Sequence, residues 1–581
     1  MTRTIAFSLA TICFAAAFGN AQPAARAGQP QATAREDALD PTPINPAADP
    51  NIDMFINDWR SAPRRTLYGK LVFRDMLTRL EGPDPQHPTK KGAVLTAITA
   101  ISYATLDSGA TAGGRSQKGE RQIFYTSAGT GQITVNSKSF DVKKGTGFTL
   151  TPDFDFKLTS TGKEPLAFYV RTEPIPANTP PNENIVVTNR FENDRRVGAH
   201  WAHIGNGGPS GMSLITIAPH TMPQPHSHPG EECWLMVEGE SILSLGKNVL
   251  RMTPGMAYKI PPTGITAHSN LNMGDEPIQM IFMGPAGGGG RGGRGGPGAP
   301  GGQTAAAGLA GQGAPPGMDF ARLDNNPYNR AAEQDIDMFI GNWRDAFPRI
   351  LHGNLYFRDM LTALQGPDSL HPARKGAVLT NAEAISYAML EPGSTAHKVD
   401  GELKGIQETF IVNSGSGVIS SGAQRIELSQ DMAFLITPEL DFRLTATGDK
   451  YMTFYVVSEK IPQAFTPKTT LEVVDNRGKA QVTNSWVNRE RPLITKDNGL
   501  SQYSAITEVE MNPMTMSRPY SDGQGVEEIW IAADGDLDML LGKELRKLLA
   551  GTAYRVPSTG ITAHANINIS GRTAKLIYMV K

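Results

Sequence analysis

The sequence predicts an all-β protein made of four small barrels, two in each of two homologous halves. Three observations support this prediction. The chain repeats itself, a Gly-rich segment separates the two copies, and each copy contains short segments with alternating apolar positions between glycine-containing turns. Alternation with a period of two is typical of strands that cover a core with one face.

The repeat is visible residue by residue, so the halves are expected to be copies of one unit. His87 with Arg74 and His371 with Arg358 occupy matching positions, which indicates an architectural role or a surface on which the halves pair. The most similar segments are DMFINDWR and DMFIGNWR at 53–60 and 337–344, KGAVLT at 91–96 and 375–380, and TGITAH at 263–268 and 559–564.

Two barrels are predicted in each half, because residues 92–173 contain several alternating segments and residues 376–459 follow the same pattern. A helical lead-in is predicted before each pair of barrels, at 51–91 and 335–375. Apolar residues there recur with the spacing of one helix face. In the first half these residues are Met54, Phe55, Trp59, Met76, Leu77 and Leu80.

The N-terminus has the pattern of a secretory signal, with an apolar run at 5–18 and a cleavage point after Ala21. The mature protein is therefore expected in the periplasm or outside the cell. The run is shorter than a membrane span and no other stretch is long enough. Cys13 would leave with the signal, so Cys233 would be the only remaining cysteine and no intramolecular disulfide is expected.

Two segments have the composition of flexible chain. Residues 22–50 are rich in Ala, Pro and Gln and are predicted to be a disordered leader, and residues 284–334 are predicted to be a linker. The linker includes Arg291 and Arg294 between glycines, a pattern also found in nucleic-acid-binding tails. Two arginines in a chain of net charge −2 favour a plain linker, and no nucleic-acid partner is expected.

One stretch of the first half carries a candidate metal-binding set. His226 and His228 are two positions apart, so a strand would direct both imidazoles to one side. A Pro-Gly turn follows, a strand begins at Glu232, and a later turn brings His268 back. Three imidazoles and one carboxylate suit one divalent transition metal, which could be Fe, Mn, Ni, Cu or Zn.

These residues resemble the two motifs of the cupin superfamily, although the opening glycine of the first motif has no match. The resemblance implies jelly-roll barrels in two bicupin halves, and metal binding by His226, His228, Glu232 and His268. The first motif is matched by His226, His228, Glu232 and Gly239, and the second by Gly255, Pro261, Gly264, His268 and Asn272, with one extra residue after Pro261. The predicted modules are 92–185 (module 1), 186–283 (module 2, with the metal site), 376–470 (module 3) and 471–581 (module 4).

Strand alternation sorts the neighbours of Glu232. Trp234 and Met236 fall on its side and could form a pocket wall or plain core, whereas Cys233 faces away and is expected to be a buried apolar thiol. Glu231 is an alternative ligand, because the alternation of side chains along the strand does not by itself decide between Glu231 and Glu232. The spacing of the cupin motif favours Glu232.

Comparison of the modules predicts one metal ion per chain. Aligning Pro225 with Pro519 sets Tyr520 opposite His226 and Asp522 opposite His228. After two additional residues Glu528 stands opposite Glu232, and His564 stands opposite His268, so module 4 keeps one imidazole and one carboxylate. That set is too small for a tight transition-metal site. Module 1 has no histidine between 92 and 173, and module 3 offers only His397 with Gln407-Glu408.

Three further histidines lie in module 2, where module 4 has other residues. They are His200, His203 and His220, opposite Ser485, Asn488 and Met514. Each could orient a ligand or move a proton, or could be surface or core filler. His220 is the strongest candidate, because it leads into the segment that carries the ligands.

Three functional readings follow. The first, which is favoured, is a metal-dependent oxygenase or dioxygenase acting on a small organic substrate. The second is a non-redox metal enzyme, namely a decarboxylase, lyase or isomerase, and the third is a binding or scaffold protein that keeps an ion. Relatives that degrade oxalate carry ligands in both barrels of a pair, which this chain does not. Internal pairing of the halves, with or without a homo-oligomer, is also expected.

Overall fold

The computed structural model describes residues 39–40, 42–175, 185–189, 200–204, 212–227, 230–284, 323–324, 328–483, 486 and 488–581, without the side chains of 200–204. The predicted signal and most of the predicted leader and linker lie outside these residues. Within them the regular secondary structure is almost entirely strand, and the all-β prediction is confirmed. No helix in the described part is long and apolar enough to cross a membrane. The helical turns are η1 (Ile52–Phe55), η4 (Ile336–Phe339) and η5 (Lys496–Asn498).

Module 1 is a barrel of two facing sheets around the aromatic core formed by Phe73, Phe124, Phe148 and Phe168. Its larger sheet has the order β13-β10-β7-β12-β5-β3-β2, with β4 paired to β3, and its smaller sheet has the order β6-β11-β8-β9. The strands are β2 (Arg64–Leu67), β3 (Leu71–Arg79), β4 (Ala93–Leu95), β5 (Ala100–Leu106), β6 (Thr111–Arg115), β7 (Glu120–Ala128), β8 (Thr130–Val135), β9 (Lys138–Lys143), β10 (Thr146–Leu150), β11 (Asp155–Ser160), β12 (Leu166–Pro174) and β13 (Val186–Asn189).

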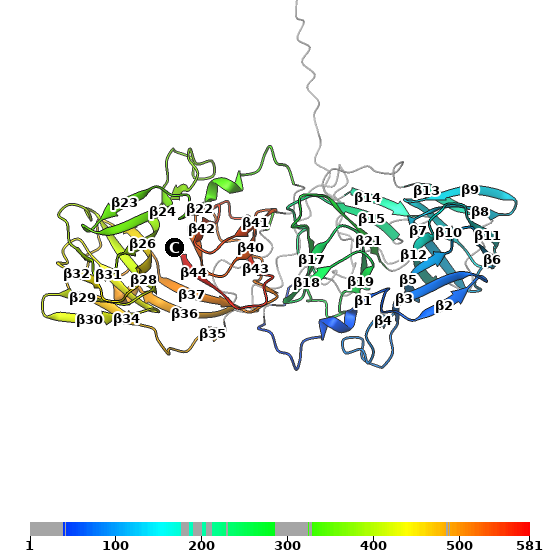
Figure 1. Ribbon diagram of the computed structural model, residues 1–581, viewed down its shortest axis with the longest axis horizontal. Coiled ribbons are helices and arrows are strands. Elements are labelled where there is room, and N and C mark those ends of the chain that lie inside the picture. The colour runs from blue at the N-terminus through cyan, green and yellow to red at the C-terminus, as the bar shows by residue number, and fades with distance from the viewer. Residues whose placement is uncertain are drawn as a thin grey trace, which may run out of the picture.

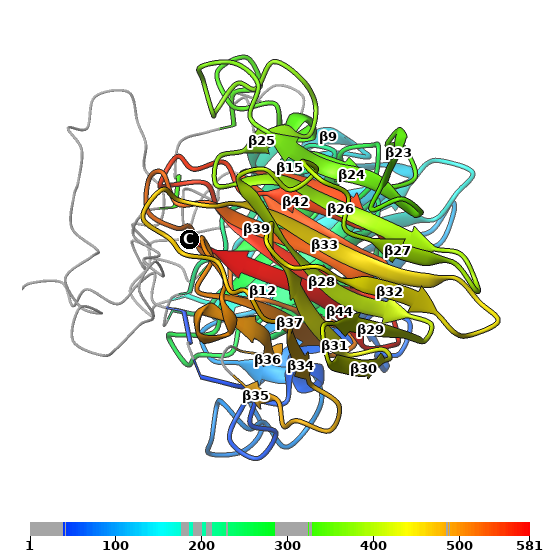
Figure 2. The same ribbon diagram turned by 90° about the vertical axis from the view of Figure 1, so that its left-hand side faces the viewer.

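Module 3 repeats this arrangement at the opposite end of the molecule (Figure 1). Its larger sheet has the order β23-β24-β26-β33-β28-β31-β34, part of which is seen side by side in Figure 2. The strands are β23 (Pro348–Leu351), β24 (Leu355–Ala363), β25 (Ala377–Leu379), β26 (Ala382–Leu390), β27 (Thr395–His397), β28 (Ile406–Ser414), β29 (Gly417–Ser421), β30 (Gln424–Leu428), β31 (Met432–Ile436), β32 (Arg443–Ala446), β33 (Met452–Lys460) and β34 (Glu472–Asp475).

Modules 2 and 4 lie in the middle of the molecule (Figure 1), and each has one sheet of its own. The strands of module 2 are β1 (Ile56–Asp58), β14 (His200–Ile204), β15 (Met212–Ile217), β16 (Cys233–Glu238), β17 (Ser241–Leu245), β18 (Asn248–Met252), β19 (Met256–Lys259), β20 (His268–Leu271) and β21 (Ile278–Met283). Those of module 4 are β22 (Ile340–Asn342), β35 (Val482–Thr483), β36 (Asn488–Thr495), β37 (Ala505–Met511), β38 (Thr515–Met516), β39 (Glu528–Asp534), β40 (Leu537–Leu541), β41 (Glu544–Leu548), β42 (Thr552–Arg555), β43 (His564–Asn568) and β44 (Ala574–Val580).

The second sheets of modules 2 and 4 are joined. β20, β17 and β18 continue into β38, β43, β40 and β41, through pairing of Asn248 with Thr515. At the far edge Thr221 bridges Glu544 of β41 on one side and Asn272, which follows β20, on the other. These strands, with the segment 219–226, therefore close into a ring built by both modules, which we call the shared ring.

The predicted helical lead-ins are wrong beyond a four-residue 3-10 turn in each half. After η1 the chain forms β1, which joins the sheet of module 2. It then forms β2 and β3, which join the sheet of module 1 ahead of its predicted start at residue 92. The reason is a β-bulge between Asp75 and Leu77. A bulge shifts the alternation by one position, so that Phe73, Met76 and Leu77 have the spacing of a helix face while lying on a strand.

The recurring tryptophan of each half packs between its two modules. Trp59 stacks on Tyr103 of module 1 with ring centroids 4.4 Å apart, and Trp343 stacks on Tyr387 with centroids 4.7 Å apart. Trp59 also lies against Gly255, where an added Cβ would come 2.4 Å from the indole. The repeated 53–60 motif therefore has an architectural role.

The matching His87 and His371 are exposed and pair with nearby aspartates.

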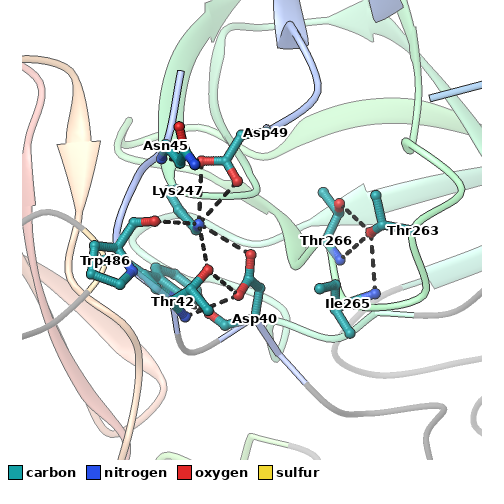
Figure 3. Close-up of polar contacts among 10 residues, drawn as sticks. Asp40, Thr42, Asn45, Asp49, Lys247, Thr263, Ile265, Thr266 and Trp486 are labelled. Atoms are coloured by element: carbon teal, nitrogen blue, oxygen red, sulfur yellow. Dashed lines mark hydrogen bonds and ion pairs between the residues drawn. The ribbon is translucent and has the colours of Figure 1, made fainter. Parts of the chain in front are cut away.

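The end of the predicted leader is ordered, so that prediction is wrong for residues 39–50. Lys247 of module 2 is buried and binds this arm through Asp40 at 3.0 Å and Asp49 at 3.2 Å (Figure 3). The arm then reaches module 4, where the Ile44 amide donates to the carbonyl of Trp486 at 2.9 Å. The end of the predicted linker, 328–334, is likewise placed, because Glu333 binds Lys543 at 2.7 Å.

Candidate metal centre

Three of the four predicted ligands converge in the barrel of module 2. The candidate donor atoms of His226, Glu232 and His268 all lie within 4.8 Å of one another. His268 is 1 % exposed and Glu232 8 %, while His226 is half-buried. His228, the fourth predicted ligand, lies outside the described residues. The structure therefore brings together donors from three separated points of the chain.

Backbone pairing sets the two imidazoles beside each other. His226 and His268 form an antiparallel bridge, in which the His268 amide donates to the His226 carbonyl at 3.0 Å. Their ring centroids are 4.2 Å apart. The Nδ1 of His226 lies 3.0 Å from the carbonyl oxygen of Gln224. A proton on Nδ1 would donate to that carbonyl and leave Nε2 as the metal-binding atom, which is the usual arrangement of a histidine ligand.

Glu232 stands at the start of β16 and is held by its neighbours. Trp234 Nε1 donates to Glu232 Oε1 at 2.6 Å, and His268 Nε2 lies 3.0 Å from the same oxygen. A buried carboxylate is stable only when it is paired and hydrogen-bonded, and these contacts supply both. The sequence allows Trp234 to be either a pocket wall or plain core, and the indole N–H adds a contact that orients Glu232.

The alternative ligand, Glu231, has a different role. Its carboxylate accepts hydrogen bonds from the Thr96 hydroxyl at 2.7 Å, the Ala97 amide at 3.0 Å and the Ile98 amide at 2.8 Å, and also from the Thr96 amide. Lys259 Nζ lies 3.7 Å away. Glu231 therefore ties module 2 to the loop after β4 of module 1, and Glu232 is the carboxylate that faces the histidines.

The predicted alternation along β16 is confirmed. Trp234 and Met236 pack in the core of module 2, whereas Cys233 and Leu235 pack in the layer between modules 1 and 2. Met236 is fully buried, so it contributes core rather than an open wall. Burial raises the pKa of the Cys233 thiol well above its usual value, which keeps it protonated, as expected of an apolar thiol.

Of the other candidate histidines, only His220 has a described side chain. His220 has a positive φ of 52° and its Nε2 lies 2.8 Å from Asp275, with the imidazole 44 % exposed. The proton-transfer role of His220 stays a prediction, and the structure gives this imidazole a surface partner. His200 and His203 lie on β14, and their side chains are outside the described part of the chain.

The described donors fit a transition-metal ion. Two imidazole nitrogens and one carboxylate oxygen are the mixed nitrogen and oxygen set that Fe, Mn, Ni, Cu and Zn accept. His226 has its second nitrogen on a backbone carbonyl, and Glu232 has its orientation fixed by an indole N–H. These are the outer contacts that hold metal ligands in place in known sites.

Module 4 has the same backbone arrangement, with different side chains at the ligand positions. Tyr520 forms the bridge to His564 that His226 forms to His268, and His564 Nε2 lies 2.9 Å from Glu528 Oε1. Trp530 Nε1 donates to that oxygen at 2.7 Å, as Trp234 does in module 2. The imidazole and the carboxylate that module 4 keeps thus lie together, and a second carboxyl, Asp522, hydrogen-bonds to Glu528.

Modules 1 and 3 keep part of the first motif, namely the spacing from its carboxylate position to its glycine, which the sequence comparison missed. The spacing of Glu232 to Gly239 recurs as Gln122 to Gly129, Glu408 to Gly415 and Glu528 to Gly535. In module 1 the Tyr68 hydroxyl donates to Gln122 at 2.6 Å, and in module 3 His352 Nε2 lies 2.8 Å from Glu408. The partner of Glu408 is thus His352, from the turn between β23 and β24, and His397 was the wrong candidate.

The fold and these donors define a β-barrel protein, and the described residues contain one candidate metal centre. Residues 213–284 match the cupin domain family. Module 2 is therefore a cupin domain, and the resemblance to the cupin superfamily is confirmed. A search of curated protein sequences finds no match.

Solved structures of oxalate decarboxylase from Bacillus subtilis are similar to part of the chain. A structure from work on the Mn(II) centres of that enzyme is 15% identical with a TM-score of 0.31, and a tryptophan-to-phenylalanine variant is 14% identical with a TM-score of 0.30. Each alignment covers 40% of this chain and 77% of the other.

Proposed function

We propose that module 2 is a metal-dependent enzyme centre, and that its reaction is an oxygenation of a small organic substrate. The observation that carries this proposal is the convergence of His226, Glu232 and His268 within 4.8 Å inside a barrel. A redox-active ion bound there would supply the activation of dioxygen, which protein side chains alone do not provide.

An apolar, aromatic surrounding of the ligands supports the oxygenase reading. The described contacts of these three side chains include an indole N–H, a backbone carbonyl and one another. Trp234 packs edge-on against Phe282 with centroids 5.3 Å apart, so the carboxylate of Glu232 lies beside an aromatic pair.

The test is oxygen uptake by metal-stripped protein reloaded with Fe²⁺, Mn²⁺, Ni²⁺ or Cu²⁺, over a panel of phenols and small acids. We expect one ion to support uptake, and the Glu232→Gln variant to lose it. The matched control is Glu528→Gln, which changes the equivalent carboxylate of module 4 and should keep the uptake. Product release without oxygen consumption would overturn the oxygenase proposal in favour of a decarboxylase, lyase or isomerase. Ion binding without turnover would leave a binding protein.

We also propose that the protein is exported, which rests on the apolar run at 5–18. N-terminal sequencing of the mature protein from culture fractions tests this. A mature chain that begins at Gln22 supports export, and a chain that begins at Met1 in the cytoplasmic fraction overturns it.

A further inference from the structure

We infer that module 4, in the second half, positions a ligand of the metal centre, because β41 of module 4 is a neighbouring strand of the segment 219–226. The inference rests on the proposed metal centre of module 2 and assigns a task to module 4. The segment ends at His226, and its only regular neighbours among the described residues are the chain around β20 and β41.

Hydrogen bonds hold the segment on both sides. On the inner side the Asn272 amide donates to the Thr221 carbonyl at 3.0 Å, and the His268 amide donates to the His226 carbonyl at 3.0 Å. On the outer side the Leu545 amide of module 4 donates to the His220 carbonyl at 3.0 Å. The segment is therefore one member of the shared ring and has no free edge at His220 and Thr221.

The apolar contacts follow the same path. Met222 of the segment and Leu271 of β20 belong to one buried core with Leu541 and Leu545 of module 4. Leu545 and Leu271 are both fully buried. The segment that carries His226 thus packs into a core that module 4 largely supplies, and its position depends on module 4.

The ring has approximate twofold symmetry, which provides a matched control. The Val249 amide of module 2 donates to the Met514 carbonyl at 3.1 Å, as the Leu545 amide donates to the His220 carbonyl. Met514 and His220 have nearly equal φ angles, 53° and 52°. The two hydrogen bonds are alike, but only the one from Leu545 supports a segment that leads to the candidate metal ligands.

The test removes each amide hydrogen without changing a side chain. Translation with the α-hydroxy analogue of leucine at position 545, or of valine at position 249, replaces the amide by an ester. Mn²⁺ is titrated into the metal-stripped proteins, and the free ion is measured by electron paramagnetic resonance. Loss of one net backbone hydrogen bond corresponds to about fivefold in an equilibrium constant. We expect Kd to rise about fivefold for the ester at 545 and to stay unchanged for the ester at 249.

Hydrogen exchange at the Asn272 amide gives a second measurement that needs no metal. We expect faster exchange in the ester at 545 than in the wild type, and no change in the ester at 249. Unchanged exchange and Kd at 545, or equal effects of both esters, overturn the inference. Absence of Mn²⁺ binding in the wild type removes the proposed metal centre instead, and the exchange measurement then still decides whether module 4 holds the segment.

Discussion

The Tyr520 hydroxyl donates a 2.6 Å hydrogen bond to Glu528, the counterpart in module 4 of the candidate ligand Glu232. The phenol ring lies 4.1 Å from the His564 ring, and the equivalent imidazoles of module 2 are 4.2 Å apart. The two barrels therefore share one backbone frame. In module 4 the Tyr520 hydroxyl binds the carboxylate of Glu528, whereas in module 2 a metal ion would bind the carboxylate of Glu232.

This relationship predicts that two substitutions create a metal site in module 4. Tyr520→His with Asp522→His gives module 4 the ligand types of module 2 at the aligned positions, with two additional residues before Glu528. We expect elemental analysis to show one additional ion per chain, because donors of the right kind would then surround Glu528 and His564.

The control for this prediction is Tyr520→Phe. It removes the hydroxyl from Glu528 without adding a nitrogen donor, so the metal content should not rise. A double variant that folds, as judged by circular dichroism, and binds no additional ion contradicts the prediction. It would mean that the two barrels differ in backbone shape as well as in the side chains at the ligand positions.

The sequence predicted the parts of this protein that depend on local pattern. The repeat, the alternation that separates Trp234 from Cys233, and the convergence of His226 with His268 all follow from periodicity and motif spacing. These features depend on residues close in the chain or on a motif of fixed spacing. Glu231 could not be excluded in this way, because its partners at 96–98 are distant in the sequence.

The errors have physical causes of two kinds. The bulge at Asp75 gave a strand the apolar spacing of a helix, so periodicity led to the wrong element. The arm at 39–50 has the composition of a disordered leader, yet it is fixed by Lys247, which lies far along the chain. Ion pairs and strand pairings between distant segments, including those of the shared ring, leave no local pattern to detect.

The second prediction separates the two adjacent glutamates. Glu232→Gln should lose most bound metal, because it neutralises the ligand that faces His268. Glu231→Gln should keep the metal and lower the free energy of unfolding by about 2 kcal/mol, because a buried charge that accepts several hydrogen bonds is lost. Metal content and chemical denaturation of both variants check this. Loss of metal in Glu231→Gln alone would contradict the assignment.

The third prediction concerns the indole N–H that orients Glu232. Trp234→Phe keeps an aromatic ring in the core and removes the donor of the 2.6 Å hydrogen bond. We expect metal affinity to fall about fivefold, the value of one net hydrogen bond, with oxygen uptake recovered at a saturating ion concentration. Trp530→Phe makes the same change at Glu528 and should leave metal affinity unaltered. Equal loss in both variants would indicate a general effect on folding.

The fourth prediction is a pH dependence of stability that originates in module 4. Burial by itself would raise the pKa of Glu528, but the charge of His564 and hydrogen bonds from His564, Asp522 and Tyr520 lower it to about 2, below its ordinary value of 4.5. A carboxyl whose pKa is lower in the folded state stabilises the fold fully above its unfolded value. That contribution is lost as the pH falls from about 4.5 towards 2.

The measurement is the difference in unfolding free energy between the wild type and Glu528→Gln as a function of pH. Carboxyl groups that do not contact Glu528 titrate in both proteins and cancel in this difference. Asp522 does contact Glu528, so both proteins also carry Asp522→Asn. We expect the advantage of the wild type to be constant from pH 7 to about 5 and to shrink on further acidification, since the protonated carboxyl then resembles the amide. A difference that is flat or grows over that window would show that the ion pair with His564 does not form in solution.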